Sequence, residues 1–101
     1  MALSNVSSAY IIANVTVTNP EQYAEYRKLS TIAVETHGAE FCVRGGAVEV
    51  LEGDWTPDRV VILKFPSMEQ ARAYYHSVEY TAAIKARQGA SVMRMVVVEG
   101  V

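Results

Sequence analysis

The stretch AYIIANVTVTNPEQ, residues 9–22, decides the fold of this 101-residue chain. Apolar side chains recur at every second position over residues 9–17, which predicts a β-strand with one side in a core. Asn19 is a favourable N-cap, Pro20 suits the first helical position, and Gln22 is placed to reach back to the backbone N–H of the cap. The stretch therefore predicts a strand that leads directly into a helix.

The same pattern returns 48 residues later. A strongly apolar run, Arg59 to Phe65, precedes the capping box SMEQ at residues 67–70. When the two copies are aligned, Val15 corresponds to Leu63, so both side chains are expected to face the helices. The alignment predicts which side of each strand belongs to the core.

Turn residues divide the rest of the chain. Residues 40–44 and 47–52 are short extended runs joined by Gly45-Gly46, and this arrangement predicts a β-hairpin. Gly38 is expected to end the first helix. The second helical region is expected to break near His76-Ser77 and to end at Gly89, before a last strand over residues 92–99.

The predicted order is β-α-β-β-α-β, the split βαβ arrangement of ferredoxin-like α+β domains, with one mostly antiparallel sheet. Residues 9–101 form a single domain in this interpretation, and residues 1–8 form a flexible N-terminus. A chain of this length can bury a core of its own.

Composition excludes several classes of function. Half of the residues are hydrophobic, and the net charge of −2 gives no basic surface for nucleic acid. Cys42 is the one cysteine, so an intrachain disulfide, a four-cysteine zinc site and a cysteine-ligated iron–sulfur cluster are excluded. No signal peptide or membrane span is recognisable. These features predict a cytoplasmic protein that binds neither nucleic acid nor membrane.

Apolar residues also occupy the side of the sheet that the helices are not expected to cover. Right-handed crossovers place both helical regions on one side. We call the other side the second face; it would carry Tyr10, Ile12, Asn14, Thr16, Val60, Ile62 and Lys64. Burying four apolar side chains at roughly 50 to 100 Å² each would contribute several kcal/mol per subunit at about 25 cal/mol per Å². A homodimer through the second face is the simplest explanation; the alternative is that the parity is reversed and these residues belong to the core.

Three runs together resemble a known family: FCVRGGAVEVLEGDW at 41–55, RVVILKFPS at 59–67 and YHSVEY at 75–80. The chain resembles, from Tyr10 to Val101, the small proteins of the domain of unknown function DUF1330. The resemblance implies a ferredoxin-like domain that pairs as a dimeric α+β barrel, and it implies no function. The wider barrel group contains monooxygenases, isomerases, decarboxylases and haem enzymes, so the fold does not choose among them.

The sequence departs from the pattern of this family at two positions. Lys64 stands where an acidic residue is usual, which puts in doubt any role that needs a carboxylate there. Val78 stands where a proline commonly begins the second part of the helix, a change that affects helix geometry more than chemistry.

Arg44 and His37 are the first candidates for a site. Arg44 precedes the two hairpin glycines, where its guanidinium could hold a carboxylate in a bidentate manner. The alternative is an arginine that pairs with Glu49 or Glu52 or is simply solvated. His37, at the helix C-terminus, could move a proton as the catalytic group. Its alternative role is to cap the last helical carbonyls.

Four further residues are candidate ligand contacts. Trp55 could form the wall of an apolar pocket or anchor its loop. Asn14 and Lys64 would be polar groups inside a mostly apolar barrel, as in ligand sites, unless Lys64 extends its ammonium to solvent. Glu52 is a candidate carboxylate. Its side chain would point to the same side as that of Asp54 only if a strand continues through Gly53.

The remaining chemistry-bearing residues give weaker signals. The helical tyrosines are typical of helix-to-sheet packing. The chain has two histidines and no acids clustered beside them, so we expect neither a metal nor a cofactor.

Two hypotheses follow. The first is a dimeric protein that binds or transforms a small organic acid or a carbonyl metabolite without a metal, and the residues do not decide whether it is an enzyme. The second is a non-catalytic dimerisation or accessory module that binds a protein partner near Trp55.

Overall fold

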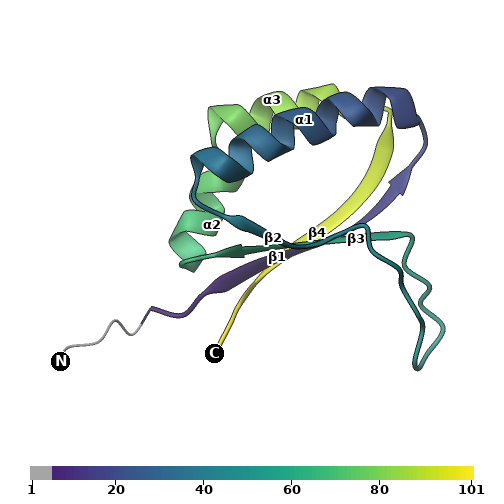
Figure 1. Cartoon of the computed structure of the whole chain (residues 1–101), viewed down its shortest axis with the longest axis horizontal. Helices are drawn as coiled ribbons and strands as arrows, with labels where there is room; N and C mark the ends of the chain where they lie inside the picture. The colour runs from purple at the N-terminus through teal and green to yellow at the C-terminus, as the bar shows by residue number, and fades with distance from the viewer. Residues whose placement is uncertain (1–5) are drawn as a thin grey trace.

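The computed structural model describes residues 6–101 and contains one four-stranded antiparallel sheet in the order β2-β3-β1-β4 (Figure 1). The elements in chain order are β1 (Ala9–Val17), α1 (Pro20–Thr36), β2 (Glu40–Arg44), β3 (Arg59–Phe65), α2 (Met68–Tyr75), α3 (Val78–Ala86) and β4 (Ser91–Glu99). This is the predicted ferredoxin-like α+β arrangement, with the second helical region divided in two.

The predicted N-terminal segment, residues 1–8, is only partly described. Residues 1–5 lie outside the described part of the chain, and residues 6–8 precede β1 without regular secondary structure. The Ser8 carbonyl accepts a hydrogen bond of 2.7 Å from the Gly100 N–H. This bond ties the chain before β1 to the chain after β4.

The first helix begins as the cap residues predict, with one correction. The Asn19 side chain accepts a hydrogen bond from the Gln22 N–H at 3.2 Å. The reciprocal bond from the Gln22 side chain does not form. Its amide nitrogen instead donates to the Ala86 and Gln88 carbonyls, at 3.1 and 2.6 Å, because the C-terminal end of α3 lies beside the start of α1 and offers free carbonyls.

Ser77 explains the break between α2 and α3. Its hydroxyl accepts from the Tyr80 N–H at 3.1 Å and donates to the Tyr74 carbonyl at 2.7 Å. One side chain therefore ends α2 and starts α3. Figure 1 shows α1 and α3 side by side above the sheet, with α2 near one end of it.

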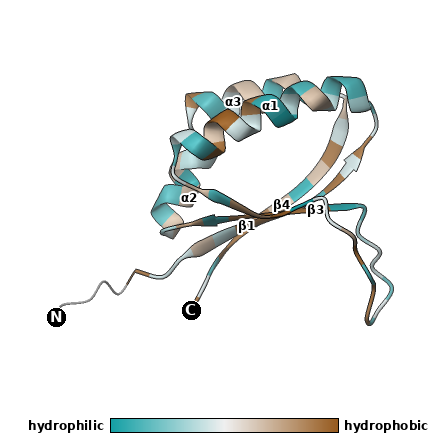
Figure 2. Cartoon of the chain, in the orientation of Figure 1, coloured by the Kyte–Doolittle hydropathy of each residue, from teal (hydrophilic) through white to brown (hydrophobic). Residues whose placement is uncertain are grey.

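The register confirms the predicted facing of the strands. Residues of β1 and β3 that point to the helices are almost completely buried: Ala9, Ile11, Ala13, Val15, Leu63 and Phe65. The helices add Tyr23, Tyr26, Tyr74 and Tyr80 to this core. The alternate residues of the same strands lie on the second face and are only partly covered. In Figure 2 the helices combine hydrophilic and hydrophobic segments, whereas the centre of the sheet is mostly pale to brown.

The predicted hairpin over residues 40–52 is wrong. β2 ends at Arg44, and residues 47–52 form no strand; β2 pairs instead with β3, across a connection of residues 45–58 that we call the arm. The reason is that β3 is the more apolar strand, and pairing with it places Phe41 opposite Leu63 on the helix side. Figure 1 shows the arm projecting from the sheet on the side away from the helices.

Candidate functional site

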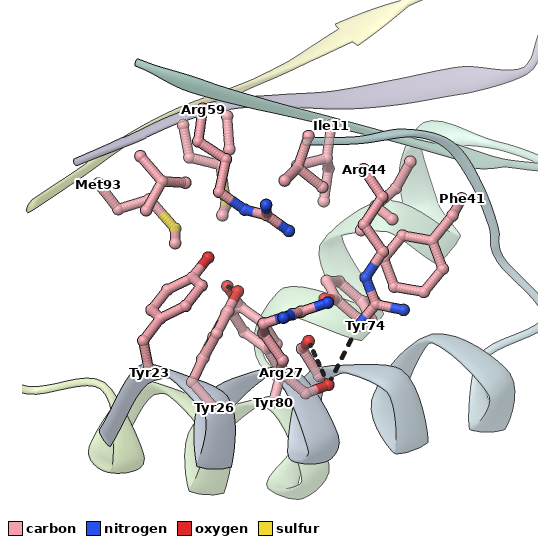
Figure 3. Close-up of a pocket in the computed structure, with 16 residues that line it drawn as sticks. Ile11, Tyr23, Tyr26, Arg27, Phe41, Arg44, Arg59, Tyr74, Tyr80 and Met93 are labelled. Carbon is pink, nitrogen blue, oxygen red and sulfur yellow. Dashed lines mark hydrogen bonds between the residues drawn. The ribbon is translucent and has the colours of Figure 1, made fainter. Parts of the chain in front are cut away.

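A cavity of about 30 Å³ lies between α1 and the helix side of the sheet. This space holds roughly one or two water molecules. Its walls combine apolar side chains from β1, β3 and β4 with tyrosines from the helices. Polar groups at the cavity come from Tyr23, Tyr26, Arg27, Ser30, Arg44, Arg59, Tyr74 and Tyr80. Figure 3 shows the Arg59 guanidinium pointing from the sheet into the space, with the Tyr23 and Tyr26 hydroxyls directed toward it.

Three arginines give the cavity a positive charge. Arg27 comes from α1, Arg44 from the end of β2 and Arg59 from the start of β3. The described residues that line the cavity include no aspartate or glutamate. Burial, followed by the charges of Arg27 and Arg59, lowers the pKa of Arg44 below its ordinary value. An anion at this position would relieve the repulsion among the three side chains.

Arg44 is held in place while part of its guanidinium stays available. Its Nη2 donates to the Thr31 hydroxyl at 2.7 Å and to the Arg27 carbonyl at 3.3 Å. Its Cζ lies 4.0 Å from the centre of the Phe41 ring. A guanidinium carries five N–H groups, and within residues 6–101 no hydrogen bond is made by Nε or Nη1 of Arg44.

Arg59 depends on Gly45. Gly45 has φ +75°, and a Cβ at this position would collide with the Arg59 guanidinium. The glycine therefore provides both a left-handed turn at the end of β2 and room for the arginine. The buried Nε of Arg59 has no hydrogen-bond partner among the described residues, which is costly for a charged group.

The tyrosines form a connected group of neutral phenols. The Tyr26 and Tyr80 oxygens are 2.7 Å apart, and the Tyr74 and Tyr80 rings are 4.7 Å apart between centres. Burial is the main reason that the pKa values of Tyr26, Tyr74 and Tyr80 are raised. These hydroxyls therefore remain protonated at neutral pH and can donate hydrogen bonds.

Arg44 is the one predicted site residue that lines this cavity. His37 lies outside its lining and caps α1 through its backbone N–H, which donates to the Ala33 carbonyl. Its ring Nε2 lies 3.1 Å from a Glu79 carboxylate oxygen. His37 thus connects the end of α1 to α3.

The other predicted residues lie on the second face or in the arm. Asn14 and Trp55 line one hollow together with Asp58 and Arg94. Lys64 lies opposite Glu40 in the β2–β3 ladder, and Glu52 is exposed in the arm. The structure thus brings Asn14 and Trp55 together, on the opposite side of the sheet from Arg44.

The sequence interpretation missed Arg27 and Arg59. A usable signal existed for Arg59, because it has the same strand parity as Leu63 and Phe65 and therefore points an arginine toward the core. Arg27 carries no such signal, since a charged residue on an amphipathic helix is ordinary.

Two further observations concern metal ligands and helix length in the described part of the chain. No group of three or more His, Cys, Asp or Glu side chains within residues 6–101 is arranged to hold a metal ion. None of the helices in this part of the chain is long and apolar enough to cross a membrane.

The fold and cavity define a ferredoxin-like α+β domain with a cationic pocket between its helices and its sheet. Residues 8–101 match the model of the family described as domain of unknown function DUF1330, and the chain belongs to that family. Among functionally curated proteins, none matches the chain.

Three solved structures illustrate the likeness of fold. A protein of unknown function from Rhodopseudomonas palustris has a TM-score of 0.74 and 23% identity, covering 94% of this chain and 83% of that chain. SnoaB, a cofactor-independent oxygenase from Streptomyces nogalater, has a TM-score of 0.60 and 9% identity, with 95% of each chain covered. A dimeric ferredoxin-like protein of unknown function from Bacteroides fragilis has a TM-score of 0.56 and 13% identity, covering 92% of this chain and 96% of that chain. At these identities the likeness concerns the fold alone.

Proposed function

We propose that the cavity between α1 and the sheet binds a small organic acid, with Arg44 and Arg59 contacting its carboxylate. The observation that carries the proposal is the convergence of three guanidinium groups on a cavity whose described lining contains no acid. A carboxylate accepts paired hydrogen bonds from a guanidinium, and both arginines have N–H groups without protein partners.

The interior of the cavity suits the rest of such a ligand. Tyrosine hydroxyls that stay protonated donate hydrogen bonds to a carbonyl oxygen, while Met93 and Met95 supply flexible apolar contacts. Because the space is only about 30 Å³, the ligand enters as the long side chains at the mouth move apart. The proposed contacts come from protein side chains alone and use no metal.

We further propose that the working unit is a homodimer formed through the second face. Val92, Val96 and Val98 of β4 expose 61%, 60% and 46% of their surface on this face. Ile12 pairs with both Ile62 and Val96 across the ladder, so the apolar residues form one band. A band of this kind on a sheet is typical of a surface that another chain covers.

Thermal unfolding with chosen carboxylates tests the binding site. Acetate, pyruvate and benzoate are the probes, and acetamide is the uncharged control. A carboxylate at about 100 times its dissociation constant adds about 2.7 kcal/mol of stability, equivalent to a rise in Tm of about 10 °C or more for a domain of this size.

Two variants test whether the stabilisation by carboxylates arises at this cavity. Arg44→Ala removes the stabilisation, whereas Arg72→Ala, a change in an exposed arginine of α2 that does not line this cavity, preserves it. If all three carboxylates leave Tm unchanged, or if Arg44→Ala responds like the unmodified protein, the proposed site is wrong.

A pair of glycine variants tests the role of Arg59 separately. Gly45→Ala and Gly38→Ala both place a side chain at positive φ, +75° and +67°, but only Gly45 has Arg59 against it. We expect both variants to lose about 1–2 kcal/mol of stability and only Gly45→Ala to lose carboxylate binding. Equal binding by the two variants would contradict a role for Arg59.

The alternative function, a module that binds another protein near Trp55, rests on a different observation. Trp55 is 62% exposed and lies in the arm. This hypothesis predicts that Trp55→Ala abolishes binding of the partner while carboxylates have no effect on Tm.

A further inference from the structure

The arm leaves the sheet on the side of the second face, and its base is fixed there. The Asp58 N–H donates to the Asn14 side-chain oxygen at 3.0 Å, and the Thr16 hydroxyl donates to the Asp58 carboxylate at 2.5 Å. Asn14 and Thr16 both belong to the second face. Figure 1 shows the arm on one side of the sheet and the helices on the other. The arm is therefore directed toward any chain that covers the second face.

The arm exposes more apolar surface than a loop needs. Leu51 is 91% exposed, Val48 and Val50 are 43% exposed each, and Trp55 is 62% exposed. In Figure 2 hydrophobic colour recurs along this projecting segment. Exposed apolar residues gathered in one segment mark an interaction site.

Residues 47–52 have the character of a strand but make no ladder within the chain. The segment AVEVLE is rich in β-forming residues, which is why the sequence predicts a strand there, and the structure leaves it without a pairing strand. Its backbone N–H and C=O groups are thus available for pairing with another strand.

The outer edge of β4 is the complementary feature. β4 is nine residues long and lies at the end of the sheet, with Val96, Val97 and Val98 exposed by 60%, 38% and 46%. The opposite edge strand, β2, has only five residues and an irregular register between Phe41 and Val43. A long apolar edge is a site for strand addition unless something covers it.

We propose that residues 47–52 of one copy add as a strand to the free edge of β4 in a second copy, so that two arms exchange across a twofold dimer. The inference rests on the proposed dimer through the second face, and it names the segment that completes it. Strand addition of this kind supplies backbone hydrogen bonds, while alternate side chains supply specificity.

Charge favours a second copy as the occupant. The arm carries acidic residues and no basic one: Glu49, Glu52, Asp54 and Asp58. The second face carries Lys64, and Arg94 of β4 lies on it opposite Asn14. The acidic arm of one chain therefore meets basic residues on the other, which sets orientation as well as affinity.

Disulfide trapping tests the exchange. Exposed Cys42 is first replaced by serine. A chain carrying Val50→Cys is then mixed with a differently tagged chain carrying Val96→Cys, Val97→Cys or Val98→Cys, and the mixture is mildly oxidised. We expect a cross-linked heterodimer with at least one of the three positions. The control partner carries Ile32→Cys, an exposed position on α1, and should give no cross-link.

Sedimentation velocity on the same proteins separates the two proposals. A dimer that gives no more cross-link at β4 than at the control position overturns arm exchange and leaves the second-face dimer intact. A monomer at all concentrations overturns both.

A second pair of variants checks the energetic role of the arm. Leu51→Ser should weaken the dimer at least tenfold, whereas Val78→Ser, a change in a valine of α3 that is 79% exposed, should leave the dimer unchanged. Equal dissociation constants for the two variants would contradict the exchange.

Discussion

The two faces of the sheet use the same strands in opposite ways. On the helix side, β1 and β3 bury apolar residues under a layer of tyrosines, and three arginines line the space that remains. On the second face, the alternate residues of the same strands include the apolar side chains of Tyr10, Ile12, Val60 and Ile62, which are only partly covered. One face is thus completed within the chain, and the other is the surface of the proposed dimer. The difference teaches that the two-residue period of one strand can give its two sides different surroundings, here a closed core with a cationic cavity and an open, partly apolar face.

The largest expected effect comes from the helix side. Phe65→Ala removes a side chain that is 0% exposed and whose ring centre lies 5.1 Å from that of Tyr74. Loss of a buried phenylalanine costs about 3–5 kcal/mol of unfolding free energy. Urea denaturation at fixed protein concentration measures this loss, and a loss below about 1 kcal/mol would contradict the assignment of this face as the core.

The next effect concerns the second face. Ile12→Asp places a charge in the apolar band and should raise the dimer dissociation constant at least 100-fold, or about 2.8 kcal/mol. Sedimentation velocity measures the constant, with Ile32→Asp on the exposed side of α1 as the control. If both variants remain dimers of equal strength, the second face is not the interface.

A smaller effect is expected inside the tyrosine group. Tyr26→Phe removes one of two buried hydroxyls that lie 2.7 Å apart and should cost about 1–2 kcal/mol. Tyr80→Phe should cost a similar amount. Because the second change removes a bond already lost, the double variant should lose less than the sum of the two single variants. Additive losses, measured by urea denaturation, would show that the hydroxyls do not interact.

The smallest effect is a dependence on pH. The hydrogen bond from His37 lowers the pKa of the Glu79 carboxyl. As the pH falls, the unfolded chain takes up this proton first, near the ordinary value of about 4.3, so the stabilisation is complete above this range and is lost as the pH falls through the lower, folded-state pKa. Glu79→Gln should flatten the fall in Tm between pH 6 and pH 3. An unchanged profile would contradict the contribution of this pair.

Much of the fold was predictable because local signals agreed with the global arrangement. The three helices begin at the N-cap residues Asn19, Ser67 and Ser77. Each cap depends on a few neighbouring residues in the sequence, so local patterns were enough to predict these positions. The facing of β1 and β3 followed from aligning the two copies of the strand-and-cap pattern. The arm was mispredicted because residues 47–52 carry strand propensity without a pairing strand, and pairing is a property of the whole sheet.

The candidate site was less predictable, since it depends on residues far apart in the sequence. Arg44 was identified from its place before two glycines, but the cavity needs Arg27 and Arg59 beside it. Asn14 and Lys64 lie on the second face, as predicted, across the sheet from the arginines. A cavity enclosed around them by a second chain stays a prediction. A cavity on the helix side depends on the distance between the helices and the sheet. The alternation of a strand assigns side chains to one face or the other but does not give this distance.

A crystal structure with a carboxylate that raises Tm tests the account most directly. We expect the carboxylate on the helix side of the sheet, with its oxygens within hydrogen-bond distance of the Arg44 and Arg59 guanidinium groups. A carboxylate bound instead on the second face beside Asn14 or Lys64, with the helix-side cavity empty of ligand, would contradict it.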